Sequence, residues 1–127
     1  MDGFTYDSEF YRFVLKDDIL WVTYKNGPVT IEIAKDLVKK RLELSKGVDH
    51  LLIVNDESLK GIDRDARSYL SSDAGVSGIK AAVLLTNNYF SQHLANFFLK
   101  ITVNKPKIPA KVFANKNEAI KWLNAQR

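Results

Sequence analysis

The sequence contains no cysteine, which excludes disulfide bonds and thiolate metal ligands. Its only histidines, His50 and His93, lie outside any zinc-protease or serine-hydrolase motif. A metal ligand or a catalytic base needs a second positioned group, so we expect both to be structural histidines. The histidines therefore give no indication of a metal site or an active site, and we expect no cofactor.

No stretch of the chain approaches the length of a membrane-spanning helix, and the first residues lack the basic start and apolar stretch of a secretory signal. Lysine and arginine exceed the acids, giving a formal net charge of +4, but they are scattered among acidic residues. A nucleic-acid-binding surface needs basic residues gathered on one face. We therefore expect a cytoplasmic, bacterial-type protein that neither spans a membrane nor binds nucleic acid.

The length of the chain limits it to one core. A sequence of 127 residues with 46% hydrophobic content can bury one ordinary core and is too short for two. We therefore predict a single domain over residues 1–127, in which residues 1–9 form a loosely ordered N-terminal segment.

Strands are predicted where aromatic and β-branched residues cluster between turn residues. The first two, Tyr11–Lys16 and Ile19–Lys25, are separated by a pair of aspartates and should form a β-hairpin. Leu51–Val54 and Lys80–Thr86 contain short apolar runs, which are typical of central strands covered on both faces. Ala110–Ala114 is the last predicted strand.

Helices are predicted where apolar residues recur every three or four positions. The first follows Thr30, an N-cap residue, and ends at Gly47. Asp63 stands where its carboxylate can cap the second helix, Phe90–Ile101 forms an aromatic third helix, and Asn115 begins a capping box for the last. The resulting order is β-β-α-β-α-β-α-β-α. This is an α/β fold with a mixed, mostly parallel sheet flanked by about four helices.

The stretch from His50 to Leu70 passes from a buried strand through a polar loop into the second helix. Short polar side chains end the apolar run because they bond nearby backbone in turns. In open α/β sheets, ligands and partners usually meet the chain at the carboxyl ends of strands. This edge is therefore the predicted functional surface, with the candidate residues Asn55, Asp56, Glu57, Ser58, Asp63, Arg64, Asp65 and Ser68.

Several of these candidates are carboxylates, which hard cations such as Ca²⁺ and Mg²⁺ prefer. Their spacing matches no EF-hand loop, and Asp63 already serves as a cap, so we interpret them as solvated acids and expect no metal. The serines of this edge could accept phosphate from a kinase, but serine is equally suited to turns and helix caps.

The element order, with Gly61-Ile62-Asp63 opening a short helix, resembles the STAS domains of bacterial anti-sigma-factor antagonists of the SpoIIAA-like kind. The likeness covers nearly the whole chain. It implies a mixed sheet flanked by helices, and binding of a protein or small ligand in place of chemistry. Uncharacterised STAS-like proteins share the pattern with which the chain finishes, namely Phe97-Phe98-Leu99-Lys100, Lys105-Pro106, Pro109, Phe113 and Glu118-Ala119-x-x-Trp122-Leu123.

The resemblance also bears on regulation. In the antagonists, a serine just after the aspartate that starts the second helix is phosphorylated to switch partner binding. In this chain Arg64 and Asp65 stand at the position of that serine, and Ala66 stands where the antagonists keep glycine. The likeness therefore implies a regulatory, protein-binding module that lacks the usual phospho-acceptor and whose protein partner is unidentified.

The aromatic residues allow a second hypothesis, in which the protein carries a lipid or another small apolar ligand under the helix 90–101. The related CRAL-TRIO lipid carriers use a similar topology. Core packing also explains these side chains, because aromatic rings fill a helix-on-sheet layer without a ligand. We further expect a homodimer, because the sheet has more apolar surface than four short helices cover. The apolar-ligand candidates are Trp21, Tyr89, Phe90, Phe97 and Phe98.

Overall fold

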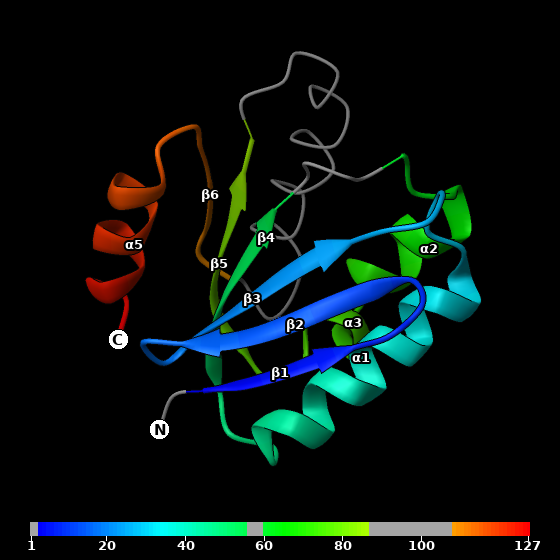
Figure 1. Ribbon diagram of the computed structural model, residues 1–127, viewed down its shortest axis with the longest axis horizontal. Coiled ribbons are helices and arrows are strands. Elements are labelled where there is room, and N and C mark those ends of the chain that lie inside the picture. The colour runs from blue at the N-terminus through cyan, green and yellow to red at the C-terminus, as the bar shows by residue number, and fades with distance from the viewer. Residues whose placement is uncertain (1–2, 56–59, 87–107) are drawn as a thin grey trace.

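The computed structural model describes residues 3–55, 60–86 and 108–127. They form a six-stranded sheet whose strands lie side by side in sequence order (Figure 1). The strands are β1 (Phe4–Asp7), β2 (Tyr11–Lys16), β3 (Ile19–Tyr24), β4 (His50–Asn55), β5 (Ile79–Leu85) and β6 (Ala110–Phe113). The described helices are α1 (Ile31–Ser45), α2 (Arg64–Leu70), α3 (Asp73–Val76) and α5 (Lys116–Asn124).

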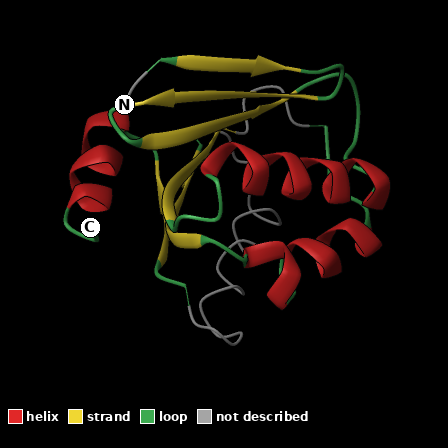
Figure 2. Ribbon diagram, turned by 90° about the horizontal axis from the view of Figure 1, so that it is seen from below, coloured by secondary structure: helices red, strands yellow, loops and turns green. Residues whose placement is uncertain are grey.

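The sheet is mixed. β1 pairs with β2 and β2 with β3 in antiparallel orientation, whereas β3, β4, β5 and β6 pair in parallel. Residues of α1, α2 and α3 pack against one face, and residues of α5 pack against the other (Figure 2). This arrangement confirms the predicted α/β fold, in which an opening hairpin adds antiparallel strands to a parallel set.

β4 shows why a continuous apolar run forms a central strand. Leu52 packs with the core on the α1 face, Leu51 and Ile53 pack with the core on the α5 face, and all three are buried. Successive side chains of a strand point to opposite faces. Because both faces of β4 are covered, the run has no polar residue at alternate positions.

The β2–β3 hairpin forms as the sequence predicts. Asp17 and Asp18, which connect the strands, have φ values of 55° and 61°. Positive φ at both central residues is the backbone of a type I′ turn, which matches the twist of the strands. Tyr11 and Phe13 of β2 then point into the core, where their side chains are 1% and 0% exposed.

The expectation of a loosely ordered segment over residues 1–9 is wrong for Phe4–Asp7, which form β1. Phe4 and Tyr6 are half-buried and pack against the core on the α1 face. The strand was missed because its alternating pattern extends over only four residues. Such a short alternation is weak as a sequence signal, and pairing with β2 stabilises it.

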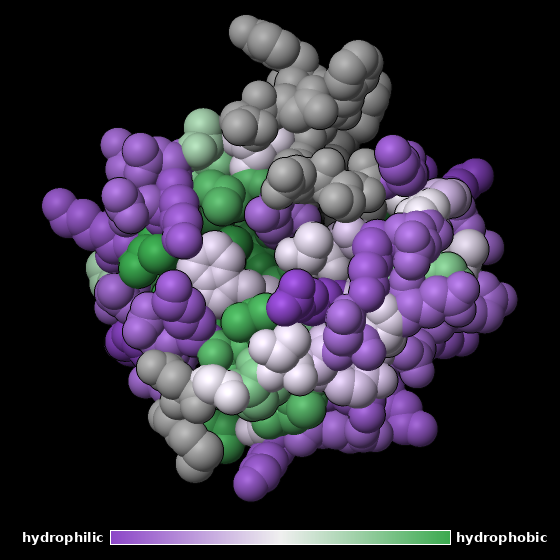
Figure 3. Space-filling view, in the orientation of Figure 1, coloured by the Kyte–Doolittle hydropathy of each residue, from purple (hydrophilic) through white to green (hydrophobic). Residues whose placement is uncertain are grey.

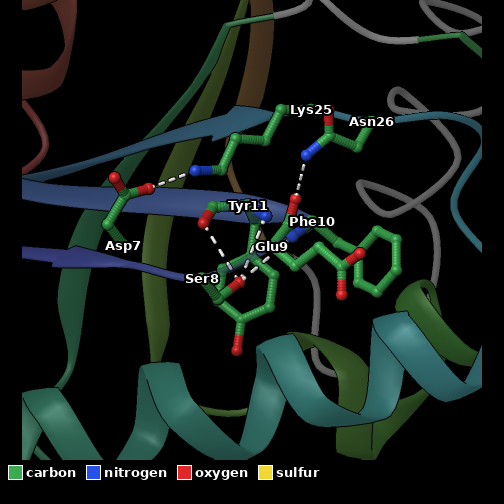
Figure 4. Close-up of polar contacts among 7 residues, drawn as sticks. All are labelled: Asp7, Ser8, Glu9, Phe10, Tyr11, Lys25 and Asn26. Atoms are coloured by element: carbon green, nitrogen blue, oxygen red, sulfur yellow. Dashed lines mark hydrogen bonds and ion pairs between the residues drawn. The ribbon is translucent and has the colours of Figure 1, made fainter.

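Side-chain contacts hold the turn between β1 and β2 (Figure 4). Ser8 Oγ accepts a hydrogen bond from the Tyr11 amide at 3.3 Å and donates one to the Tyr11 carbonyl at 3.2 Å. Lys25, just after β3, forms an ion pair with Asp7 at the end of β1. These contacts connect the edge strand β1 to β2 beside it and to the end of β3 beyond.

The helix caps mostly follow the sequence. Thr30 Oγ1 accepts a hydrogen bond from an amide in the first turn of α1 at 3.3 Å, and Asn115 Oδ1 does the same for α5 at 3.0 Å. At the end of α1, Lys46 takes the left-handed conformation with φ 55°, and the Gly47 amide donates to a carbonyl of the last turn at 3.3 Å. This is a common way to end a helix.

The connection 71–78 contains the short helix α3. Ser72 Oγ accepts a hydrogen bond from the Gly75 amide at 3.2 Å. A Cβ atom at Gly75 would overlap the backbone carbonyl oxygen of Tyr69 and would lie 2.7 Å from the Cα of Leu70. Glycine at this position therefore allows α3 to pack directly against the end of α2.

Candidate functional site

The predicted functional edge begins at the carboxyl end of β4. Asn55 is the last residue of that strand and is half-buried. Asp56, Glu57 and Ser58 lie outside the described residues, so their part in the site stays a prediction. The described part of the edge runs from Lys60 through α2.

Backbone hydrogen bonds attach the segment before α2 to the residues before α1. The Val29 amide donates to the Gly61 carbonyl at 2.9 Å, and the Asp63 amide donates to the Val29 carbonyl at 2.9 Å. Val29 and Ile62 thereby form an isolated parallel bridge. Gly61 has a φ of +139°, a conformation that residues with side chains rarely adopt. These contacts fix where α2 begins.

Asp63 does not cap α2 as the sequence predicts. α2 begins at Arg64, as expected, but the Asp63 side chain makes no capping hydrogen bond and its carboxylate is exposed. Arg67 instead donates from its guanidinium to the Ile62 carbonyl at 2.6 Å. The backbone bonds of Val29 and the bond from Arg67 hold this end, so the helix start does not depend on a carboxylate cap.

Four of the predicted site residues form what we call the α2 surface: Asp63, Arg64, Asp65 and Ser68. All four are exposed, whereas Ala66 between them is buried against the core. Hydrophilic side chains cover the part of the molecule where α2 lies (Figure 3). The α2 surface therefore presents both signs of charge and a hydroxyl on a helix that is fixed from behind. Such a surface is suited to recognition by complementary charges.

Trp21 is the member of the apolar-ligand set that the structure describes. It is half-buried and packs with the core on the α5 face, where Lys116 Nζ lies 5.3 Å from the ring centroid. Its indole Nε1 is buried and has no acceptor among the described residues. These contacts place Trp21 in core packing. The other members lie outside the described residues, namely Tyr89, Phe90, Phe97 and Phe98.

A groove of about 560 Å³ lies at the opposite end of β4 from the α2 surface. Its volume is within the range of ligand sites, roughly 300–1,000 Å³. His50, Asp49 and Lys80 contribute polar atoms to it. The sequence placed an apolar-ligand site elsewhere, under a predicted helix over residues 90–101, which lie outside the described residues. The apolar lining of the groove is Phe4, Leu15, Leu20, Leu44, Val48 and Leu51.

Sequence reasoning missed a buried polar cluster around Arg41. The Arg41 side chain is 1% exposed. Its Nη1 donates to the Ser77 carbonyl at 2.8 Å and lies 3.1 Å from His50 Nε2, and its Nη2 donates to the Gly75 carbonyl at 3.0 Å. A signal was present, because Arg41 falls on the buried face of α1, three and four positions after Val38 and Leu37.

The geometry fixes which nitrogen of His50 carries the hydrogen. Nδ1 lies 3.0 Å from the Val48 carbonyl oxygen, which can only accept, so Nδ1 donates. Nε2 faces the guanidinium of Arg41, which can only donate, so Nε2 accepts. Both nitrogens are thus engaged, in agreement with the prediction of a structural histidine.

Burial shifts the proton equilibria of this cluster. It lowers the pKa of Arg41 to about 10, because the charged guanidinium is removed from water. Burial is also the main cause of a lowered His50 pKa, which the nearby Arg41 charge lowers further and the Val48 carbonyl partly offsets. Buried Tyr24, near Arg41, has its pKa raised to about 12 by desolvation. Imidazole and phenol groups here therefore favour their neutral forms near pH 7.

Two further observations concern metal and membrane. No group of three or more metal-ligating side chains occurs within residues 3–55, 60–86 and 108–127. Since Asp56 and Glu57 are not among these residues, the expected absence of a metal stays a prediction. No helix in the described part of the chain is long and apolar enough to cross a membrane.

Comparison with solved structures shows the fold. The chain is similar to an uncharacterised protein of the DUF3478 family from Shewanella loihica PV-4, which has a SpoIIAA-like fold. The identity is 15%, the TM-score is 0.64, and the match covers 95% of this chain and 99% of that one. The chain is also similar to the anti-sigma factor antagonist SpoIIAA in its unphosphorylated form, with 13% identity and a TM-score of 0.55 over 90% of this chain and 97% of that one. This confirms the fold that the resemblance implied.

Comparison of the sequence alone places the chain among domains of unknown function. No curated protein matches it. The family model of DUF7793, a domain of unknown function, matches residues 13–127. The matched segment runs from β2 through α5, and so contains both the α2 surface and the Arg41 cluster. The chain therefore belongs to the DUF7793 family and has a SpoIIAA-like fold.

Proposed function

We propose that this protein is a non-enzymatic regulatory module that binds a protein partner through the α2 surface and the loop before it. The observation that carries the proposal is the exposure of Asp63, Arg64, Asp65 and Ser68 on a helix whose start is fixed by Val29. The position at the carboxyl end of a parallel strand supports it, because such edges are where α/β sheets usually meet ligands and partners. The similarity to an anti-sigma factor antagonist supports a regulatory role.

The proposed module acts without a phosphorylation switch at the start of α2. Asp65 lies in the first turn and is exposed, so it carries a fixed negative charge near the position at which the antagonists carry a regulated one. A phosphate would bring about −1.5 to −2 charges there, so the aspartate is a partial mimic of the modified state. Partner binding should therefore be constitutive at this position.

The proposal of a non-enzymatic protein is supported by chemistry rather than by comparison. Of the two histidines, His50 has both ring nitrogens engaged and cannot serve as a base without breaking its bonds. The charged groups of the α2 surface are exposed, whereas catalytic acids and bases need an environment that moves their pKa values apart. We expect no cofactor.

Capture of the partner and replacement of Asp65 test the proposed function. The native host supplies the lysate, and a protein bound by the wild type is identified and purified. Replacing Asp65 with Ser or Asn should weaken binding at least tenfold, about 1.4 kcal/mol, without an equal loss of fold. Glu118→Gln is the matched control, because Glu118 is an exposed first-turn acid on α5, on the other side of the sheet. Equal affinity of the wild type and both Asp65 variants would refute the regulatory role of this residue.

A second candidate function is binding of a small apolar ligand, which the groove beside His50 favours. Its apolar lining and its volume of about 560 Å³ fit a ligand of modest size. Native mass spectrometry of the purified protein should then show a bound adduct, and Leu44→Trp, which fills the groove, should remove it. A bare chain mass would exclude carriage of a ligand. An adduct that survives Leu44→Trp would place the ligand elsewhere, as under the predicted helix 90–101.

We also propose that the protein forms a homodimer. On the α5 face, Val14 of β2 and its cross-strand neighbour Trp21 are half-buried. Val48 is 66% exposed and is the exposed large hydrophobic residue of the described part of the chain. Apolar surface of this kind is often covered by a second copy. Sedimentation should show a dimer at high micromolar concentration, and a monomer there would contradict the proposal.

A further inference from the structure

Arg41 carries a buried positive charge whose known acceptors are all neutral. Its guanidinium contacts the carbonyl oxygens of Ser77 and Gly75 and the ring of His50. No carboxylate forms an ion pair with it among the described residues. Removing a cation from water is costly, and here neutral acceptors must offset that cost. The hydrogen bond from Arg41 to His50 Nε2 therefore helps to offset the cost of burying the guanidinium. It exists only while Nε2 is unprotonated.

Protonation of His50 would place two donors face to face. Nε2 and Arg41 Nη1 are 3.1 Å apart, and the other ring nitrogen already donates to the Val48 carbonyl. Because both nitrogens of imidazolium are donors, neither a change of tautomer nor a ring flip restores an acceptor toward Arg41. A second positive charge at this distance also repels the guanidinium.

Other charged groups around His50 do not cancel this repulsion. Asp49 precedes it in the chain and favours the protonated form, but less strongly than burial and Arg41 oppose it. Lys80 of the neighbouring strand β5 also lines the groove and adds positive charge. Asp18 from the hairpin and Arg127 after α5 complete the charged lining, with opposite signs. The groove itself brings solvent, and hence protons, to the imidazole.

Arg41 also connects His50 to α2. It holds the carbonyl of Gly75 in α3 and that of Ser77 just after it. Gly75 in turn packs so closely against the Tyr69 carbonyl and Leu70 that no Cβ atom fits there. Displacement of the guanidinium therefore removes two hydrogen bonds that hold α3 and the residue after it, and α3 supports the end of the helix that bears the α2 surface.

We propose that the contact between Arg41 and His50 is a proton-sensitive switch: protonation of His50 displaces the guanidinium from Gly75 and Ser77 and loosens α3 and the end of α2. The link from this switch to partner binding rests on the proposed function of the α2 surface. Acidification would then lower partner affinity by disordering the support of that surface.

The wild-type protein tests the switch by NMR, without any partner. Long-range ¹H–¹⁵N spectra at neutral pH should show His50 with hydrogen on Nδ1, and its titration should lie below the ordinary pKa of 6.5. Amide exchange, expressed as protection factors that correct for the intrinsic effect of pH, should then be followed for residues 71–77. Their protection should fall at least threefold as His50 becomes protonated.

His50→Gln is the decisive variant, because its amide can accept from Arg41 and donate to the Val48 carbonyl but does not titrate. Protection of residues 71–77 in this variant should not fall with acidification beyond the change seen in β5. His93→Gln, which removes the other histidine, should behave as the wild type. The proposal is overturned by hydrogen on Nε2, by an ordinary His50 pKa, or by the same acid-induced loss of protection in His50→Gln.

The switch and the proposed function fail in different experiments. If Asp65 variants bind the partner as the wild type does while protection still depends on His50, the switch stands and the α2 surface loses its regulatory role. If partner binding needs Asp65 while the amide protection of residues 71–77 does not change with protonation of His50, the proposed function stands and the switch is refuted.

Discussion

Arg41→Lys should cost far more stability than the same substitution on the surface. Arg41 uses two nitrogens to reach three acceptors, at 2.8, 3.0 and 3.1 Å, from a side chain that is 1% exposed. Lysine keeps the charge but has a shorter reach and a single ammonium, which cannot reproduce the planar fork of the guanidinium. At least one carbonyl, of Gly75 or Ser77, is then left buried without a donor.

The size of the loss follows from those bonds. A buried acceptor that loses its partner costs about 1–3 kcal/mol, and an ammonium is more strongly hydrated than a guanidinium and so harder to bury. Together, the lost acceptor and the burial of the ammonium should cost about 2–4 kcal/mol. This is a large part of the roughly 5–15 kcal/mol that stabilises a domain. Arg67→Lys is the matched control, because Arg67 is exposed and its guanidinium donates a hydrogen bond to the Ile62 carbonyl. Its loss should stay under about 1 kcal/mol.

Urea unfolding, followed by circular dichroism and by tryptophan fluorescence, measures both variants. Arg41→Lys should lower the midpoint strongly without changing the slope, provided the two probes coincide. Equal losses for Arg41→Lys and Arg67→Lys, within about 0.5 kcal/mol, would refute the reasoning that the three bonds of Arg41 stabilise the fold.

The remaining predictions concern local packing and capping, and the free energy of unfolding in urea measures each. Gly75→Ala should lose about 2–3 kcal/mol of unfolding free energy, because its Cβ would overlap a backbone carbonyl of α2. Gly47→Ala, where φ is +75° but space is open, should lose about 1 kcal/mol. A larger loss for Gly47→Ala than for Gly75→Ala would contradict the close packing of α3 on α2. Tyr11→Phe should lose about 1–2 kcal/mol, since the Tyr11 hydroxyl donates to Asp36 at 2.6 Å, and an unchanged stability would show that this bond contributes nothing. Asn115→Ala should lose about 1 kcal/mol through its cap on α5, and Asn115→Asp, which can still accept, should recover most of it.

Local chemistry determined most elements of the fold. The alternation of β2, the apolar run of β4 and the aspartate turn between β2 and β3 each depend on neighbours in sequence. Thr30 and Asn115 act on amides three residues away, so their caps are also visible in the sequence. β1 was missed because four residues give too weak an alternation, and its formation depends on pairing with β2.

The candidate site, too, was predictable in part from local sequence and depends in part on tertiary contacts. The sequence located the turn into α2 and the polar residues that the structure exposes there, because a polar loop after an apolar strand is a local pattern. It assigned a carboxylate cap to Asp63, but the Asp63 side chain makes no capping bond. Backbone hydrogen bonds with Val29 and a hydrogen bond from Arg67 hold the start of α2 instead. Val29 is distant in sequence, so no local rule could have supplied its backbone pairing.

Only the tertiary structure decided the role of Arg41. The helical period places Arg41 on the buried face of α1, but an arginine on that face could equally extend its charged end to water. The fold instead brings His50 and the carbonyls of Gly75 and Ser77 to the guanidinium, from positions 9, 34 and 36 residues away. Burial of a charge is tolerated only where acceptors converge on it, and that convergence is a property of the folded chain.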